Sequence, residues 1–216
     1  MRPWLAVVVA GSFAMPLAAQ RGGARSCAGP DTTAQWYRDQ RAAMDDSRRN
    51  WSSDTLRERL LGAAGIDPAV PLAAQWGWQV DGRAPATGPD VEGGVSRLRQ
   101  VLRAGRGSAW PTRSVVGAAG VRAVWILVQQ DTALERAALH RMMEAGPEES
   151  LPADIAVLED RVRALSNRKQ LYGTQLSRVN GRVIVMPIED SAHVDLRREA
   201  AGLPPLRQAV CAAGGT

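Results

Sequence analysis

One apolar segment, Val115–Val128, constrains the fold of this chain more than any other feature. It is the most apolar stretch that follows residues 1–19, and Arg122 interrupts it. At about 14 residues it is too short to cross a lipid bilayer. Its small residues, Gly117 to Gly120, allow neighbouring elements to approach closely. A helix that is apolar on all sides must be buried, so the segment predicts a central helix enclosed by others.

Other segments have the apolar spacing of helices together with start and stop signals. The expected starts, in chain order, are at Asp31–Thr33, Ser53, Asp90, Thr132 and Ser150–Pro152. The first four of these helices are expected to end at Arg49, Gly65, Gly105–Gly107 and Gly146–Pro147. Thr132 and Glu135 have the spacing of a capping box, in which the threonine side chain caps the helix.

The last of these helices carries an apolar face and a pair of adjacent charges. Its inward residues are expected to be Ile155, Leu158, Val162 and Leu165. Asp160 and Arg161 fall away from the centre of that face. Neighbouring opposite charges on a helix are usually solvated, so both are expected to face water.

A β-hairpin is predicted near the C-terminus, over Gln170–Pro187. Asn180-Gly181 is a sequence that favours the type I′ turn of two-residue hairpins. Its arms are expected at 170–178 and 182–186, and Pro187 ends the pairing because it lacks an N–H donor. Asp195 is expected to cap a short helix at 196–201, followed by a docked tail. The fold class is therefore mostly α: one helical domain at 31–210 with a central buried helix and a C-terminal two-stranded β-hairpin, then a tail at 211–216.

The N-terminus has the layout of a secretory signal peptide over residues 1–19. A short positive start precedes an apolar run, and small residues lead to a cleavage point near Ala19-Gln20. Residues 20–30 are expected to form a flexible leader. The alternatives are an uncleaved anchor or a disordered tail. The favoured reading predicts a secreted or periplasmic protein with no stable membrane span after cleavage.

The chain has two cysteines, Cys27 and Cys211, one near each end. In an exported protein two cysteines commonly pair, and this pair would tie the ends of the mature chain together. Two free thiols in mobile tails are the alternative. No histidine lies close to either cysteine in the sequence, so neither reading makes them catalytic.

Composition excludes several classes of function. The net charge is +5, but the arginines are scattered among acidic residues, so nucleic-acid binding is not expected. The two histidines, His140 and His193, belong to no cluster with metal-ligand spacing, so no metal site is expected. The sequence has no phosphate-binding loop, serine nucleophile elbow or dinucleotide fingerprint, and no cofactor is expected. His193 could act as a base between two aspartates, but an exposed loop position is favoured.

Several short motifs occur in order between residues 90 and 207. They are Trp110-Pro111, Val116-Gly117, Trp125–Asp131, Asp160-Arg161, Gln170–Gln175, Pro187–Asp190, Val194–Arg198 and Gly202-Leu203. On these motifs the chain resembles a bacterial family of unknown function, domain of unknown function 6624. The most specific of them is Tyr172-Gly-Thr-Gln175.

The resemblance bears on catalysis through one position. The family pattern has Gln-His-Ala-Asp where this chain has Gln129-Gln130-Asp131-Thr132. If the family histidine acts as a general base, this chain lacks it, because glutamine cannot take up a proton at neutral pH. The resemblance therefore weakens an enzymatic reading and leaves open whether the protein is an enzyme.

The candidate site combines three polar groups. Its acid–base candidates are Asp131 and Asp160, and its binding candidates are Gln129, Gln130, Arg161, Gln170, Tyr172, Thr174, Gln175 and Arg198. These residues either converge on a hydrolase cleft, form a binding surface, or lock the hairpin onto the helices through a buried polar network. The expected function is a non-catalytic binding or structural module of the cell envelope, with an envelope hydrolase as the alternative. Small molecules, peptides and glycans are possible ligands, and Trp76 and Trp78 either stack on a sugar ring or are buried.

Overall fold

A computed structural model describes residues 51–67, 86–104 and 110–214. The predicted signal peptide, leader and first helix, as well as Trp76, Trp78 and Cys27, lie outside the described residues. The elements are α2 (Asp54–Ala64), α4 (Val91–Arg103), α5 (Arg113–Val128), α6 (Thr132–Ala145), α7 (Pro152–Leu165), β1 (Leu176–Val179), β2 (Arg182–Val185), η3 (Ser191–His193), α8 (Val194–Ala200) and α9 (Leu206–Ala212). The prediction of a mostly α fold with a small hairpin near the C-terminus is confirmed.

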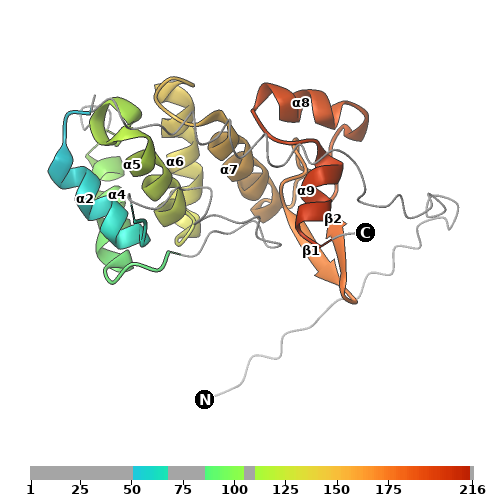
Figure 1. The fold of residues 1–216 in the computed structure, drawn as a ribbon, viewed down its shortest axis with the longest axis horizontal. Coiled ribbons are helices and arrows are strands. Elements are labelled where there is room, and N and C mark those ends of the chain that lie inside the picture. Colours follow the sequence, from blue (N-terminus) through green and yellow to red (C-terminus); the bar gives the residue numbers. More distant parts are fainter. Residues whose placement is uncertain (1–50, 68–85, 105–109, 215–216) are drawn as a thin grey trace, which may run out of the picture.

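Helix α5 is the buried helix that the apolar segment predicts. Every residue from Val116 to Val128 is buried. Helices α2, α4 and α6 pack against it (Figure 1). Its central position follows from its sequence, because only a helix covered on all sides can bury apolar residues all round.

The start of α5 is kinked at Gly117, whose φ of 71° and ψ of 173° are not helical. The kink interrupts the helical hydrogen bonding of the first turn. Arg57 on α2 donates from Nη1 to the carbonyl oxygen of Val116 at 2.7 Å. The backbone N–H groups of Ser52 and Ser53 donate to the carbonyls of Ser114 and Val115, both at 3.0 Å. The N-terminal end of α2 thus satisfies backbone groups that the kink exposes.

Most helix ends lie where the sequence predicts them. Ser53 caps α2 by accepting from the N–H of Leu56, and Gly65 ends that helix in the left-handed conformation. Asp90 caps α4 by accepting from the N–H of Gly93. Gly146 ends α6.

The predicted capping box at the start of α6 is wrong by one residue. Asp131, not Thr132, is the N-cap, and its carboxylate accepts from the N–H of Ala133 at 2.8 Å. Glu135 is not part of a capping box. It is completely buried and binds Arg161 of α7 instead. Asp131 and Thr132 are both residue types that cap helices well, so the local sequence alone does not show which of them is the N-cap.

The orientation predicted for α7 is also partly wrong. Leu158 is buried as expected, but Leu165 is 56% exposed and Asp160 is 0% exposed. The side of α7 that carries Asp160 is covered by the backbone that follows the helix rather than by apolar side chains. A polar residue can occupy such a buried position because backbone N–H groups satisfy it.

The hairpin is shorter than predicted, although its turn is where it is expected. Strands β1 and β2 are antiparallel, with Leu176 opposite Val185 and Val179 opposite Arg182. Asn180 and Gly181 both have positive φ, as the type I′ turn requires. The first predicted arm began at Gln170, but residues 170–175 form a loop that an isolated bridge between Gln170 and Ile188 closes at its base.

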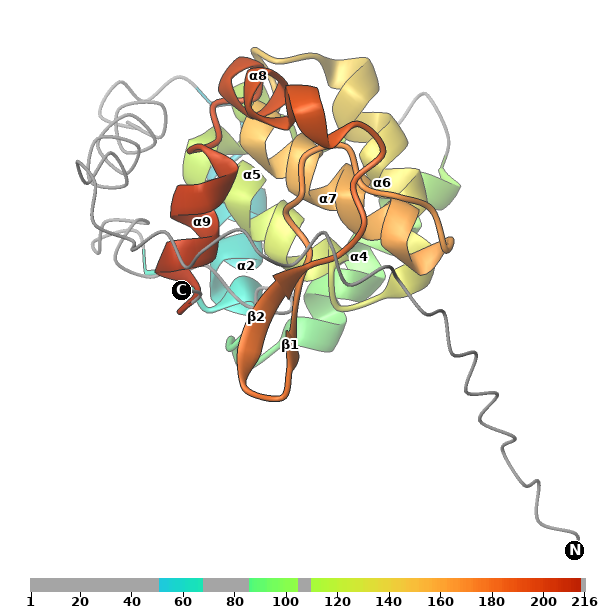
Figure 2. The same ribbon diagram turned by 90° about the vertical axis from the view of Figure 1, so that its right-hand side faces the viewer.

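The C-terminal region is more helical than predicted. Asp195 does not cap α8, which starts at Val194 after the short helix η3. Its carboxylate accepts from the N–H of Leu206 at 2.7 Å and so caps α9. The predicted docked tail therefore leads into this helix, and the start of the predicted 211–216 tail belongs to it. Figure 2 shows α8, α9 and the hairpin together on one side of the molecule.

Among the described residues, none of the helices is long and apolar enough to cross a membrane. The pairing of Cys27 with Cys211 stays a prediction, because Cys27 is outside the described residues. Cys211 itself lies on α9 and is half-buried.

Candidate functional site

The carboxylate of Asp160 is the centre of the polar cluster predicted around the hairpin. It projects from α7 into the loop 171–174 and accepts hydrogen bonds from three backbone N–H groups. Leu171 donates to Oδ1 at 2.7 Å, Tyr172 to both oxygens at 3.1 and 3.2 Å, and Thr174 to Oδ2 at 2.9 Å. The hydroxyl of Thr174 donates to the same Oδ2 at 2.9 Å. Charge-assisted bonds of this kind are stronger than neutral ones, so the loop is held firmly on α7.

Gln170 and Gln175 close the base of the same loop. The amide nitrogen of Gln170 donates to the carbonyls of Gln175 and Met186 at 3.1 and 2.8 Å. Its oxygen accepts from the N–H of Gln175 at 2.6 Å. The side chain of Gln175 reaches α7 and donates to the carbonyl of Val157 at 3.4 Å. Both glutamines are buried, and their side chains tie the backbone of the loop to the end of β2 and to α7.

Two arginines of α8 hold the other side of the loop. Arg198 is completely buried and donates to the carbonyls of Tyr172 and Pro204 at 2.7 and 2.6 Å. Burial lowers the pKa of Arg198 to about 10, so it remains charged at neutral pH. Arg197 donates from Nε to the carbonyl of Leu171 at 2.8 Å. The loop is thereby fixed by a carboxylate on its N–H side and by guanidinium groups on its carbonyl side.

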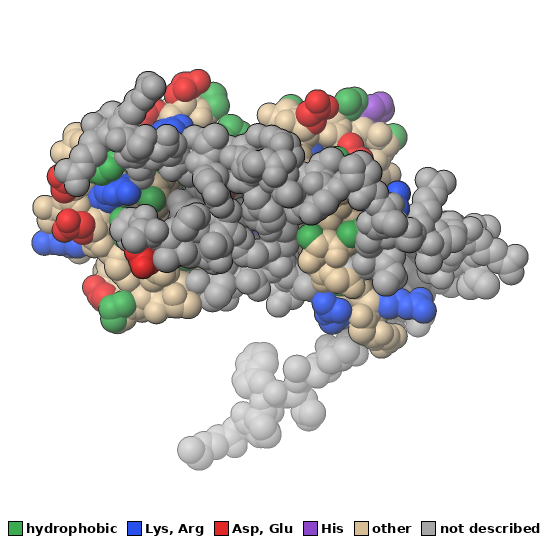
Figure 3. Space-filling model, in the orientation of Figure 1, with side chains coloured by type: hydrophobic (Ala, Val, Ile, Leu, Met, Phe, Trp, Pro, Cys, Tyr) green, Lys and Arg blue, Asp and Glu red, His purple; other side chains and the backbone are tan. Residues whose placement is uncertain are grey.

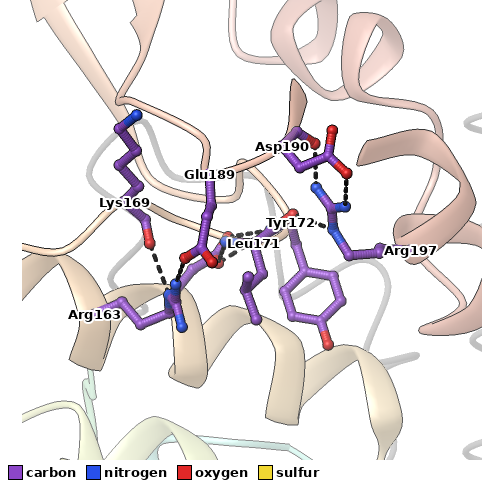
Figure 4. Close-up of polar contacts among 8 residues, drawn as sticks. Arg163, Lys169, Leu171, Tyr172, Glu189, Asp190 and Arg197 are labelled. Atoms are coloured by element: carbon purple, nitrogen blue, oxygen red, sulfur yellow. Dashed lines mark hydrogen bonds and ion pairs between the residues drawn. The ribbon is translucent and has the colours of Figure 1, made fainter. Parts of the chain in front are cut away.

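Figure 4 shows how the surrounding charges extend this arrangement. Arg163 of α7 binds the carbonyl of Lys169 at 2.7 Å and forms an ion pair with Glu189. Arg197 contacts both the carboxylate and the carbonyl of Asp190. Arg163, Glu189 and Arg197 were not among the predicted site residues, although the motifs Pro187–Asp190 and Val194–Arg198 contain the last two.

Arg161, the other half of the predicted pair, turns away from the loop. Its Nε donates to Glu135 Oε1 on α6 at 2.5 Å. The Glu135 side chain is fully buried and that of Arg161 is 13% exposed. This ion pair joins α6 to α7. The guanidinium of Arg161 therefore binds a carboxylate of the protein itself and does not point towards the loop 171–174.

The polar end of α5 forms a second group. Gln129 and Gln130 each donate back to a carbonyl of their own helix, four residues earlier, at 3.0 and 2.9 Å. Asp131 accepts from Arg99 Nε of α4 at 2.7 Å. Burial alone would raise the pKa of Asp131, but the hydrogen bonds from Arg99 and from the N–H of Ala133 outweigh it, and the pKa lies below its ordinary value. The group therefore caps α6 and binds α4.

The predicted site residues accordingly lie in two separate sets of contacts. Asp160, Gln170, Thr174, Gln175 and the backbone of Tyr172 are brought together, and Arg198 joins them. The contacts of Gln130 and Asp131 run to α4, α5 and α6 instead. No local motif separates the two sets, because the angle between α5 and α7 is a tertiary property.

A pocket of about 370 Å³ lies beside the loop. It is bounded by the end of α6, the start of α7, the ring of Tyr172 and the last turn of α8. Its lining residues are mostly apolar: Met143, Gly146, Pro147, Pro152, Ile155, Ala156, Tyr172, Arg197, Ala200 and Ala201. Its volume lies at the low end of the range of small-molecule sites in proteins, and it is an open pocket, with the apolar walls and few polar groups common to such sites. Of the predicted site residues, only Tyr172 is part of this lining.

The phenol of Tyr172 is the polar group best placed to bind a ligand in this pocket. In Figure 4 its ring points away from the contacts of its own backbone. Within the described part of the chain, its hydroxyl makes no hydrogen bond. Burial, together with the nearby carboxylates of Glu159 and Asp160, raises the pKa of Tyr172 above its ordinary value. The hydroxyl is therefore protonated at neutral pH and is available as a donor and an acceptor.

A buried ion pair that sequence analysis missed lies on the other side of the start of α7. Arg122 Nη1 of α5 is 2.9 Å from Asp154 Oδ1, and both side chains are almost wholly buried. Burial raises the pKa of Asp154 to about 6, although the Arg122 charge opposes the shift. The pair joins the central helix to the helix that carries Asp160. Only the presence of Arg122 in an apolar segment signalled it.

Of the two histidines, only His193 borders one of these clusters, through Asp190, which Arg197 also contacts. His193 is exposed and lies 2.8 Å from Asp190, and His140 is exposed on α6 near Glu144. In the described ranges no three His, Cys, Asp or Glu side chains are grouped closely enough to hold a metal ion.

The fold and the site define a class of small helical protein in which buried polar side chains fasten a β-hairpin to a central helix bundle. A model described as "Family of unknown function (DUF6624)" matches residues 83–213, and the chain belongs to this family. The resemblance inferred from the motifs between residues 90 and 207 is thus confirmed. No curated protein and no solved structure matches the chain.

Proposed function

We propose that this protein is a non-catalytic binding module of the cell envelope, and that its ligand occupies the pocket beside Tyr172. One observation carries the proposal. The carboxylate of Asp160 is inaccessible and fully used in holding the loop 171–174, and this same loop positions the Tyr172 ring at the pocket. The cluster that the sequence singles out thus supports a recognition element. Export rests on the signal-peptide layout of residues 1–19.

The chemistry of the pocket defines the class of ligand. Its walls are formed by proline, alanine, isoleucine and methionine side chains, which favour an apolar body. The Tyr172 hydroxyl supplies one hydrogen bond to fix its orientation. The guanidinium of Arg197 is already bound to Leu171 and Asp190, so it does not add a strong anion site. An apolar small molecule or a hydrophobic peptide segment with one polar group fits these features.

The alternative, an envelope hydrolase, needs an accessible acid or base. Asp160 is 0% exposed, and Asp131 is bound to Arg99 while it caps α6. General acid–base catalysis requires a group within hydrogen-bond reach of the reacting atoms. The geometry of these two carboxylates gives the hydrolase less support than it gives the binding module.

A ligand screen with two matched variants tests the proposal. Ala200→Trp fills the pocket, whereas Ala212→Trp makes the same change at an exposed position on α9. Ligands from small-molecule and peptide libraries should raise the melting temperature of the wild type and of Ala212→Trp, but not that of Ala200→Trp. A ligand that stabilises all three proteins equally would place binding elsewhere. Hydrolysis that Asp131→Asn abolishes without changing stability would favour the alternative.

A further inference from the structure

The hairpin has an inner and an outer face, which its register defines. Residues directly opposite each other in an antiparallel pair lie on the same face, and successive residues alternate between faces. Leu176 and Val185 lie on the inner face, where Leu176 is buried. Val179 and Ile184 lie on the outer face and are 47% and 44% exposed. Met186 follows Ile184 by two residues and is also exposed, at 36%.

The same segment is strongly basic. Residues 161–188 contain six basic residues and no acidic one, whereas the whole chain has 27 basic and 22 acidic residues. The exposed basic side chains of this segment are Arg168, Lys169, Arg178 and Arg182. Arg178 and Arg182 flank the turn. Arg182 lies on the outer face, whereas Arg178 lies on the inner face and donates to the carbonyls of Gly181 and Ala213. Figure 3 shows basic and no acidic side chains at the lower right, where Figure 1 places the hairpin.

Basic residues next to exposed aliphatic ones suit a lipid surface better than a nucleic acid. Anionic headgroups attract arginine, and the adjacent acyl region accepts aliphatic side chains. Single-stranded nucleic acids are usually bound through aromatic side chains that stack on bases, and residues 176–186 contain none. The charge complementarity therefore selects anionic lipid.

We propose that the hairpin docks the protein on an anionic membrane surface. Val179, Ile184 and Met186 enter the interface, while Arg182 on the same face binds the headgroups and the charge of Arg178 beside the turn adds to the attraction. The docking is peripheral and leaves the pocket beside Tyr172 outside the bilayer. It does not depend on that pocket, so an experiment can contradict the membrane docking without contradicting the proposed binding function, and the reverse.

Cosedimentation of the full chain with vesicles tests this docking. We expect binding to vesicles that contain phosphatidylglycerol, weaker binding to phosphatidylcholine alone, and release by salt. Arg178→Gln with Arg182→Gln should lower the partition coefficient about 20-fold. Ile184→Ser should lower it about fivefold. Because every variant carries the same N-terminal residues, differences between variants report on the hairpin.

The control removes the same charge from exposed positions on α2 and α4. Arg59→Gln with Arg103→Gln should change the partition coefficient less than about twofold, because helices α2 and α4 lie at the opposite end of the molecule from the hairpin (Figure 1). Unchanged melting temperatures would show that all variants fold. An equal loss of binding in this control and in the hairpin variant would contradict the proposal. Self-association that Ile184→Ser abolishes, without vesicle binding, would assign the outer face to a second copy of the chain and overturn it.

Discussion

Asp160 and Thr174 are joined twice, because the backbone N–H and the hydroxyl of Thr174 both donate to the same carboxylate oxygen at 2.9 Å. The two residues are fourteen positions apart, and the link brings the loop that precedes β1 back onto α7. The buried carboxylate thus takes the place of a strand partner for this loop. A group saturated in this way has a structural role, and its removal should affect folding before it affects any chemistry.

Asp160→Asn should lower the free energy of unfolding by about 3–4 kcal/mol. The variant keeps the shape of the side chain but directs an amide N–H₂ at groups that are themselves donors. Thr174→Val, which removes the hydroxyl bond to Asp160 and the bond that Gln175 Nε2 donates to the hydroxyl at 3.2 Å, should cost about 1–2 kcal/mol. Both are measured by guanidinium unfolding. Equal stability of Asp160→Asn and the wild type would show that the carboxylate does not hold the loop.

Gly173→Ala should destabilise the protein by about 1–2 kcal/mol. Gly173 has a φ of +67°, and a Cβ there would lie 2.7 Å from Ile188 Cδ1 and 3.0 Å from Leu206 Cδ1. Gly62→Ala is the matched control, because Gly62 lies within α2 with nothing within 4 Å of an added Cβ. That substitution should stabilise by about 0.5–1 kcal/mol. Thermal unfolding that shows the same sign for both variants would contradict this account.

The buried pair Arg122–Asp154 predicts a dependence of stability on pH. The folded-state pKa of Asp154, about 6, lies above its ordinary value of 3.8. The folded state therefore favours the protonated form of Asp154. The stability that this form contributes is present at low pH and is lost as the pH rises through about 6. Between about pH 4 and pH 7 it should lower the free energy of unfolding by an amount on the order of 2 kcal/mol.

Asp154→Asn isolates this effect, because asparagine does not titrate. The wild type should lose more stability than the variant between these pH values in denaturant titrations. Asp131, Glu149 and Asp190 have lowered pKa values, so the stability that they contribute is lost as the pH falls. This loss begins only as the pH approaches and passes below their ordinary pKa values. Parallel pH profiles of wild type and variant would show that Asp154 has no raised pKa.

Tyr172→Phe should separate stability from binding. The hydroxyl makes no hydrogen bond within the described residues, so its loss should change the free energy of unfolding by less than about 0.5 kcal/mol. The affinity for a ligand found in the screen should fall several-fold, since the ring remains but the polar group is lost. Calorimetric titration measures this. An unchanged affinity would place the ligand away from Tyr172.

The predictable parts of the fold are those that local sequence determines. The Val115–Val128 segment, which is apolar except for Arg122, indicated a buried helix, and Asn180-Gly181 indicated a type I′ turn. Both could be predicted without knowledge of the surrounding structure. Ser53 and Gly65 mark helix ends through their own backbone and side-chain chemistry. These signals depend on residues within one turn of each other.

The parts that were not predicted depend on contacts between distant residues. The solvated position expected for Asp160 is wrong because the N–H groups that satisfy it belong to residues 171–174. The start of α9 is capped by Asp195, eleven residues before Leu206, so no local sequence motif predicts this helix. The separation of Asp131 from Asp160 follows from the packing of α4, α5 and α6, which no spacing in the sequence encodes.

Native-state hydrogen exchange of the amides of Leu171, Tyr172 and Thr174 tests the central claim most directly. In the wild type these three N–H groups should exchange slowly, because they donate to a buried carboxylate. In Asp160→Asn their exchange should accelerate about 100-fold or more, whereas Asp195→Ala, which removes the acceptor that caps α9, should leave them unchanged. Unchanged exchange in Asp160→Asn, together with the loss of a measurable reaction, would contradict the account and make Asp160 a functional acid.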